Sequence, residues 1–260
     1  MKIFLALVLF FTFDIKTFAA IHSESVEYRH GDKVLEGYLA YDDSMEGKRP
    51  GVLVVHEWKG LGDYAKRRAN ELAQLGYIAF ALDMYGKGVF AKTHDEAGKL
   101  AGIYFSDRTL VRARARAGLD VLLKHPLTDT RRVAAIGYCC GGTSVLELAR
   151  SGAQIAGVVS FHGNLVTPHP GDAKNIKCKV LVLHGANDFF MKPDQVLAFQ
   201  EEMRQAKVDW QMTYYGGCVH AFTLPEVGND ASTGLAYNEL ADKRSWRAMK
   251  DFFEEIFQKQ

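Results

Sequence analysis

A cysteine between glycines is the feature of this 260-residue chain that is best suited to chemistry. The segment Gly137-Tyr-Cys-Cys-Gly141 has the form glycine, any residue, nucleophile, any residue, glycine. That form is typical of a sharp turn from a buried strand into a helix, where bulkier neighbours would clash with the backbone. At the N-terminus of the following helix, the helix dipole and free N–H groups would favour a thiolate. We therefore predict that Cys139 is a nucleophile.

A nucleophilic cysteine needs a base that takes its proton and a third group that orients the base. In α/β-hydrolases the chain order is nucleophile, acid, histidine, each on a loop after a strand. Asp188 follows the apolar run 180–183, and His220 follows the run 210–215. Alone, Asp188 would be a helix cap and His220 a surface residue of a glycine-rich loop. The ordered combination with Cys139 predicts a catalytic triad.

A second loop of chemical interest follows the apolar run 52–55. There, the backbone N–H of Trp58 would act with that of Cys140 to stabilise a tetrahedral oxyanion. Glu57 precedes Trp58, and a carboxylate beside the nucleophile could accept its thiol proton in the resting enzyme. The alternative for Glu57 is a surface residue that pairs weakly with Lys59 or a nearby arginine.

The remaining histidines are expected to have supporting roles. His56 ends a core strand and should orient its neighbours, and His184 should brace a loop. His94, His162 and His169 show no ligand spacing with a partner, so we expect no metal, and no cofactor is indicated.

The elements that position these residues alternate between strands and helices. Strands are predicted at 26–29, 34–41, 52–55, 77–82, 133–136, 155–160, 180–183 and 210–215. Helices are predicted at 64–75, 92–104, 108–124, from 143 onwards, at 195–206 and at 240–257. This order predicts an α/β-hydrolase fold: a mainly parallel central sheet, an antiparallel N-terminal edge hairpin, and helices on both faces. The loops after the parallel strands should converge where such sheets bind ligands.

Composition limits the possible partners. The 48% of hydrophobic residues allow a sizeable core, and we expect a single domain over 21–260. Lys and Arg total 32 against 31 Asp and Glu, so no net field would attract nucleic acid or a membrane. The basic stretch 108–116 is predicted to be a solvated helix face. A small molecule is the expected partner, and the chain is expected to be a monomer or small homo-oligomer.

Residues 1–20 have the pattern of an export signal. A positive start at Lys2 precedes the apolar run 3–13, and small residues allow cleavage near Ala19 or Ala20. The run is too short to span a bilayer, and the alternative, a buried first helix, would have no polar face. We therefore expect a periplasmic or secreted protein without a membrane anchor after signal removal.

Four cysteines, Cys139, Cys140, Cys178 and Cys218, raise the question of disulfides in such a compartment. A bridge between the adjacent Cys139 and Cys140 would be strained. Cys178 and Cys218 could pair only if their Cα atoms came within about 7 Å. Free buried thiols are the simpler expectation, and redox work by Cys139 and Cys140 lacks the usual Cys-x-x-Cys spacing.

The motif Gly137–Gly142, with His56-Glu57 upstream and Asp188 and His220 downstream, resembles the dienelactone hydrolases, or carboxymethylenebutenolidases, over about residues 25–258. The resemblance implies a Cys-His-Asp triad on a compact α/β-hydrolase fold. It also implies that the glutamate matching Glu57 holds the cysteine as a thiol until substrate displaces it. An enol-lactone would then be hydrolysed through an acyl-thioester.

Members that act on dienelactone carry arginines that hold the substrate carboxylate. One follows the strand matching 77–82, and one follows the catalytic histidine. Neither 83–88 nor 220–225 contains arginine. Lys87 would replace one only as a point charge, and Tyr85 and Phe222 complete the predicted substrate contacts. We therefore expect another small activated ester or lactone as substrate. The alternative is a non-catalytic binding protein of the cell envelope with this fold.

Overall fold

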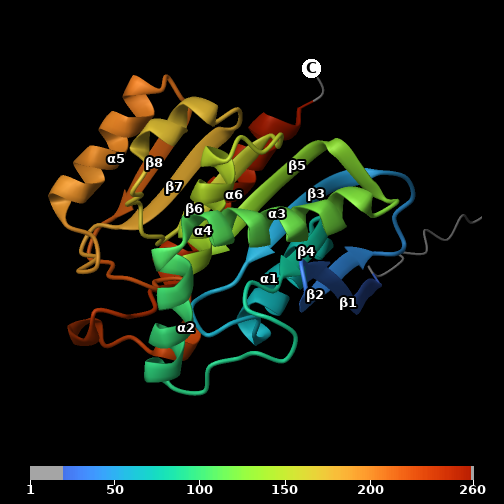
Figure 1. Cartoon of the computed structure of the whole chain (residues 1–260), viewed down its shortest axis with the longest axis horizontal. Coiled ribbons are helices and arrows are strands. Elements are labelled where there is room, and N and C mark those ends of the chain that lie inside the picture. Colours follow the sequence, from blue (N-terminus) through green and yellow to red (C-terminus); the bar gives the residue numbers. More distant parts are fainter. Residues whose placement is uncertain (1–19, 259–260) are drawn as a thin grey trace, which may run out of the picture.

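The computed structural model describes residues 20–258, so the predicted export signal lies almost wholly outside the described residues. Its centre is an eight-stranded sheet with the order β1-β2-β4-β3-β5-β6-β7-β8 (Figure 1). The strands are β1 (Ile21–His30), β2 (Lys33–Asp42), β3 (Arg49–Val55), β4 (Ile78–Leu82), β5 (Thr128–Tyr138), β6 (Gly157–Phe161), β7 (Lys179–Gly185) and β8 (Trp210–Tyr215).

The predicted mixed character of the sheet is confirmed. β1 and β2 form an antiparallel hairpin, and β2 pairs antiparallel with β4. From β4 to β8 every pairing is parallel. The carboxyl ends of β3, β5, β7 and β8 consequently face the same edge, so the loops after them can build one site.

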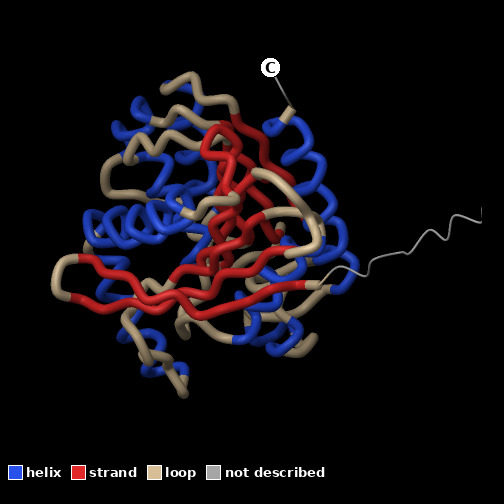
Figure 2. Tube along the Cα trace, turned by 90° about the vertical axis from the view of Figure 1, so that its right-hand side faces the viewer, coloured by secondary structure: helices blue, strands red, loops and turns tan. Residues whose placement is uncertain are grey.

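Helices cover both faces of the sheet, as Figure 2 shows from the side. They are α1 (Asp63–Gln74), α2 (His94–Ser106), α3 (Arg108–Lys124), α4 (Cys140–Arg150), α5 (Pro193–Gln205) and α6 (Glu239–Phe257), with short 3-10 turns at Pro170–Asn175, Pro225–Val227 and Ala231–Thr233. α3, α4 and α5 bury apolar residues on one face, and α1 and α6 bury theirs on the other.

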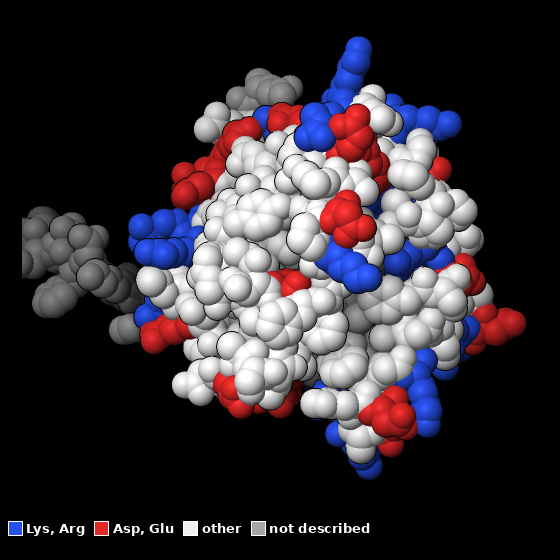
Figure 3. Space-filling view, turned by 90° about the vertical axis from the view of Figure 1, so that its left-hand side faces the viewer, with Lys and Arg blue, Asp and Glu red and all other residues white. Residues whose placement is uncertain are grey.

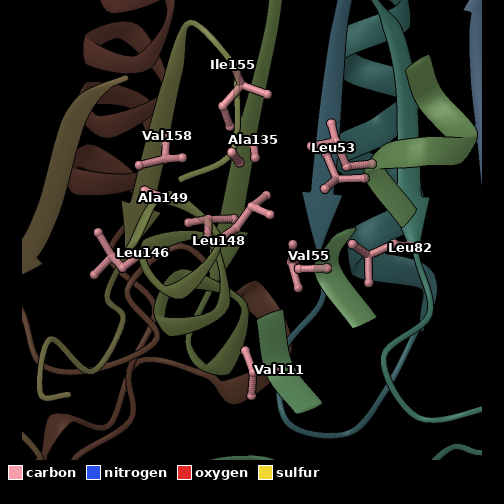
Figure 4. Packing of buried hydrophobic residues seen from close by; sticks show 14 of the residues in the cluster. Leu53, Val55, Leu82, Val111, Ala135, Leu146, Leu148, Ala149, Ile155 and Val158 are labelled. Atoms are coloured by element: carbon pink, nitrogen blue, oxygen red, sulfur yellow. The ribbon is translucent and has the colours of Figure 1, made fainter. Parts of the chain in front are cut away.

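Alternation along the strands explains the two cores. In β3, Leu53 and Val55 face the α3 and α4 side, whereas Val52 and Val54 face α1 and α6. Figure 4 shows the first of these cores, where Leu82 lies near Val55 and α4 contributes its own apolar side chains. A strand that is apolar on both faces is what a parallel sheet covered by helices requires.

Several boundaries differ from the sequence prediction. β1 begins at Ile21 and β3 at Arg49, five and three residues before the predicted strands. β5 begins at Thr128, five residues before the predicted strand, because its start pairs with Arg49 and Pro50 across an irregular step in register. α4 begins at Cys140 and not at 143. Gly141 and Gly142 disfavour a helix locally, but close packing against neighbouring backbone requires glycine there.

Within residues 20–258, no helix combines the length and the apolar character that crossing a membrane would demand.

Candidate active site

Cys139 occupies a strained turn between β5 and α4. Its backbone has φ 55° and ψ −115°, a region that residues with a side chain rarely adopt. A Cβ on Gly137 would lie 2.0 Å from the oxygen of Gly141, and one on Gly141 would lie 2.1 Å from the oxygen of Val55. Glycine at both positions therefore lets the turn close tightly and lifts Cys139 above the sheet.

The loops after β7 and β8 bring the predicted acid and base together. Nδ1 of His220 donates to Oδ2 of Asp188 over 2.8 Å, and both residues are buried. Oδ1 of Asp188 accepts from the backbone N–H of Phe190 at 2.9 Å, which fixes the carboxylate. The Phe190 ring packs edge-on against His220, with 5.3 Å between the ring centroids. The imidazole of His220 is therefore held by its hydrogen bond to Asp188 and by packing against the ring of Phe190.

A cavity of about 430 Å³ collects the candidate residues. Cys139, Cys140, His220, Glu57 and Trp58 all line it. The remaining wall comes from α2 and from loops after β6, β7 and β8, through Gly98, Ala101, Gly102, Phe105, Asn164, Phe190, Ala221, Leu224, Val227 and Leu235. The wall is therefore mainly apolar, around a small group of polar side chains.

Electrostatics keep the resting thiol protonated. A side-chain hydrogen bond with Cys140, whose Sγ lies 3.9 Å away, and burial raise the pKa of Cys139 well above its ordinary range, while His220 opposes the shift. Burial lowers the pKa of His220, but a negative charge at Cys139 and the hydrogen bond to Asp188 raise it to about 10. The charge at Cys139 exists only once its proton has left, so the resting pair is a thiol and an imidazole held by Asp188.

Glu57 shares this cavity but forms no hydrogen bond with Cys139 among the described residues. Its Oε1 is buried and has no partner in that part of the chain. Burial, followed by the charge of Glu226, raises the pKa of Glu57 to about 8, although Arg68 opposes the shift. The carboxyl is therefore protonated at neutral pH. The alternative of a weak surface pair with Lys59 does not fit this burial.

The two residues predicted to supply backbone donors to an oxyanion hole, Trp58 and Cys140, both line the cavity. The N–H groups of Trp58 and Cys140 have no hydrogen-bond acceptor in the structure from residue 20 to 258. The Trp58 loop is braced, because Nδ1 of His56 donates to the oxygen of Glu57 at 2.5 Å and the hydroxyl of Tyr85 donates to the oxygen of Trp58 at 3.0 Å. His56 thus orients its neighbours.

The three predicted substrate contacts do not line the cavity, and their placement corrects that prediction. Lys87 points to the edge hairpin, where it pairs with Glu27 at 2.9 Å and Glu36 at 3.1 Å. The Tyr85 hydroxyl donates to the oxygen of Trp58, and the residue lines a separate small pocket with Cys140. Phe222 is fully buried in the core, and Ala221 lines the cavity in its place.

Sequence reasoning overlooked two contributors. α2 supplies a wall of the cavity, a role that its weak amphipathic pattern did not indicate. His162 contacts the backbone of Cys139, and no motif marked it.

The basic stretch 108–116 is only in part a solvated face. Arg114 is buried, and Arg112 pairs with the buried Glu147 at 2.8 Å. Arg116 is exposed beside Asp120, as predicted for such a face. Glu147 of α4, remote in the chain, holds Arg112 against the protein.

All four cysteines are free thiols, so Cys178 and Cys218 are not paired. Among the described residues, no group of three or more His, Cys, Asp or Glu side chains is arranged to hold a metal ion.

A parallel sheet with a strained turn after β5, an acid after β7 and a histidine after β8 defines a protein of the α/β-hydrolase class. Comparison with known proteins narrows the class. The chain belongs to the dienelactone hydrolase family, which it matches over residues 35–257. It is therefore a hydrolase of esters or lactones with a small-molecule substrate, and the resemblance seen in the sequence is confirmed.

Individual relatives span nearly the whole chain. Protein usf of Aquifex pyrophilus is 31% identical over 237 residues, covering 89% of this chain and 98% of that protein. A dienelactone hydrolase-like promiscuous phosphotriesterase from metagenomic libraries is 42% identical, with a TM-score of 0.87 over 91% of this chain and 99% of its own. A dienelactone hydrolase from Anabaena variabilis shares the fold at 20% identity, with a TM-score of 0.62 over 88% of this chain and 98% of its own.

Proposed function

We propose that the protein hydrolyses a small activated ester or lactone through a Cys139-His220-Asp188 triad and an acyl-thioester. One observation carries the proposal: the strained Cys139 and His220, whose Nδ1 is hydrogen-bonded to Asp188, line the same cavity. Each feature alone has a structural explanation, but together they supply nucleophile, base and orienting acid.

In the acylation step, His220 takes the proton of the Cys139 thiol while the sulfur attacks the substrate carbonyl. The carbonyl oxygen becomes an oxyanion, which accepts hydrogen bonds from the N–H groups of Cys140 and Trp58. When the intermediate collapses, the C–O bond to the leaving group breaks and His220 returns its proton to that oxygen. Asp188 stabilises the imidazolium that exists between these events.

In the deacylation step, water replaces the departed alcohol. His220 removes a proton from the water as it attacks the thioester, and a second oxyanion forms in the same hole. Collapse breaks the C–S bond, releases the carboxylic acid and restores the Cys139 thiol. In a lactone the alcohol and acid remain one molecule, so it leaves only after this step.

Glu57 keeps the resting cavity free of charge in this proposal. Because its pKa is raised to about 8, it stays a neutral carboxyl at pH 7. A carboxylate there would oppose both the thiolate and the oxyanion. The expectation that Glu57 accepts the thiol proton does not fit this protonated carboxyl: the raised pKa of Cys139 comes from Cys140 and burial.

The cavity wall favours neutral substrates. Within the described chain, neither Lys nor Arg is among its lining residues, and Lys87 is committed to Glu27 and Glu36. Phe190, an exposed apolar side chain, is among the lining residues. Figure 3 shows a face of the molecule on which a broad area carries few charged side chains. An uncharged acyl or aryl ester suits such a wall better than a dicarboxylate.

The test is turnover of p-nitrophenyl acetate by the wild type and by Cys139→Ala. We expect Cys139→Ala to lose turnover and to lose inactivation by iodoacetamide. Acid-quenched wild type should carry an acetyl group on the peptide that contains Cys139. Cys178→Ala, which removes a buried thiol outside the cavity, is the matched control and should keep its activity. Turnover that survives in Cys139→Ala would show that another residue is the nucleophile.

We also propose that residues 1–20 direct export and are then removed. The lysine, apolar run and small residues of that segment support this. Mass spectrometry of protein recovered from the periplasm or medium should give a mature N-terminus near residue 20 or 21. Full-length protein confined to the cytoplasm would contradict the proposal.

A further inference from the structure

His162 lies directly beneath the strained turn of Cys139. It follows β6, is fully buried, and itself has φ 40°. Its Nδ1 accepts a hydrogen bond from the backbone N–H of Cys139 at 3.1 Å. The same N–H also donates to the oxygen of Phe161 at 3.0 Å, which continues the pairing of β5 with β6.

The hydrogen bonds define one tautomer of His162. A backbone N–H can only donate, so Nδ1 must be unprotonated. Nε2 then carries the ring hydrogen and donates to Oγ1 of Thr223 at 2.8 Å. Burial holds the pKa of His162 well below its usual range, which agrees with a neutral ring.

Thr223 is held in turn by hydrogen bonds that begin at residues of α1. The hydroxyl of Tyr64 donates to Oγ1 of Thr223 at 2.7 Å, and Nε of Arg68 donates to the Tyr64 hydroxyl at 3.2 Å. Arg68 is anchored by Asp242 of α6. The ring of His162 is therefore held by a chain of buried groups from α1 and α6.

The same ring also packs against the proposed base. The rings of His162 and His220 lie edge to face, with 5.2 Å between their centroids. One side chain thus contacts the backbone of the proposed nucleophile and the imidazole of the proposed base. Cys139 and His220 line the cavity, whereas His162 itself does not.

We propose that His162 is a positioning residue: the lone pair of its Nδ1, aimed by Thr223, holds the Cys139 backbone in the strained conformation that places the sulfur for attack. The inference rests on the proposed role of Cys139 as nucleophile. A strained backbone conformation of this kind persists only where contacts with the surrounding structure hold it in place. His162 supplies such a contact at the strained residue itself.

Two substitutions separate the two hydrogen bonds of the ring. In His162→Asn the carboxamide oxygen lies near the place of Nδ1, so the acceptor for Cys139 remains, and asparagine tolerates positive φ. In His162→Gln the longer carboxamide reaches the place of Nε2, so contact with Thr223 remains and the side-chain acceptor for Cys139 is lost, leaving only the Phe161 oxygen. His169→Asn, in the exposed part of the same loop, is the matched control.

The readouts are kcat and KM for p-nitrophenyl acetate, the iodoacetamide rate at Cys139, and the thermal midpoint. We expect His162→Gln to lower kcat about 10- to 100-fold with KM nearly unchanged, because a small misplacement of a reacting group has effects of that size. His162→Asn should recover most of that loss. Equal kcat values in the two variants, or a wild-type kcat in His162→Gln, would overturn the proposal.

If either variant fails to fold, Thr223→Val replaces it, because it frees the ring and leaves His162 in place. A lowered kcat at wild-type KM supports the inference, and an unchanged kcat overturns it. The Cys139→Ala variant distinguishes failure of the proposed triad from failure of the proposed positioning role of His162. If that variant retains turnover, the triad fails; if it is inactive while the His162 variants behave alike, only the positioning role fails.

Discussion

Asp188 and His220 are joined by a 2.8 Å hydrogen bond between Oδ2 and Nδ1, although 32 residues separate them in the chain. The parallel pairing of β7 with β8 makes this contact possible, because it brings the ends of both strands to the same edge. The bond fixes which ring nitrogen carries the proton. His220 is thereby left with Nε2 free to exchange a proton with Cys139.

Removing the charge of Asp188 should therefore disable the base without disturbing the fold. We expect Asp188→Asn to lower kcat about 10³- to 10⁴-fold through the wrong tautomer of His220, with little change in KM. Asparagine keeps an oxygen for the N–H of Phe190, so the loop should survive. Steady-state kinetics with p-nitrophenyl acetate provide the check. Asp194→Asn, an exposed acid at the start of α5, should retain wild-type kcat.

Ionisation of Glu57 should determine how kcat/KM falls at alkaline pH. Its pKa is raised to about 8 by burial and Glu226, so it is neutral below that value and becomes a carboxylate as pH rises through it. The new negative charge opposes thiolate and oxyanion, and kcat/KM should fall above about pH 8. Glu57→Gln should remove this fall. An unchanged alkaline limb in Glu57→Gln would assign the ionisation to another group.

Glu57 also makes a prediction about stability. The folded protein keeps the Glu57 proton between the ordinary pKa near 4.5 and about 8, whereas the unfolded chain releases it. The free energy of unfolding should therefore decline as pH rises through this window. Glu57→Gln should raise the thermal midpoint more at pH 8 than at pH 5. Calorimetry at both pH values measures the difference, and equal gains would contradict the raised pKa.

The glycines of α2 should determine how large a substrate fits. Gly98 and Gly102 line the cavity, and a Cβ added to either would meet no atom within 4 Å. Gly102→Leu should lower kcat/KM for p-nitrophenyl hexanoate about tenfold relative to the acetate by filling this space. Lys99→Leu adds the same side chain to the exposed face of the helix and should leave the ratio unchanged.

A thermal measurement distinguishes this effect from damage to the helix. Glycine inside a helix costs about 1 kcal/mol relative to alanine, so Gly98→Ala and Gly102→Ala should raise the thermal midpoint. Loss of activity on the larger ester together with a higher midpoint would identify a filled cavity. A lower midpoint with uniform loss on both esters would instead indicate disruption of α2.

A buried ion pair should secure the helix that follows Cys139. Arg150 of α4 is fully buried and contacts Glu202 of α5 at 2.8 Å and Glu147 at 3.1 Å. Arg150→Leu would leave the buried Glu202 without its cationic partner, while Glu147 keeps Arg112, and we expect a loss of about 3–5 kcal/mol in unfolding free energy. Urea denaturation tests this. The exposed Arg204, paired with Glu201, is the control, and Arg204→Ala should change the midpoint little.

The sequence by itself determined the order of the elements, the position of the sharp turn and the identity of the proposed triad. Apolar runs and glycine spacing are local properties, so they mark strands and the turn at Cys139 without knowledge of neighbours. Asp188 and His220 were found because a parallel sheet brings the loops after its strands to one edge.

Only the tertiary structure decided which other side chains reach the cavity. Lys87 follows β4, as a substrate-binding residue would, but it forms ion pairs with Glu27 and Glu36 of the edge hairpin and not with a group in the cavity. His162 carries no motif, and its role depends on Thr223 and Cys139, which come from different strand ends. These outcomes depend on competing partners far apart in the chain, and folding alone brings those partners within reach of one another.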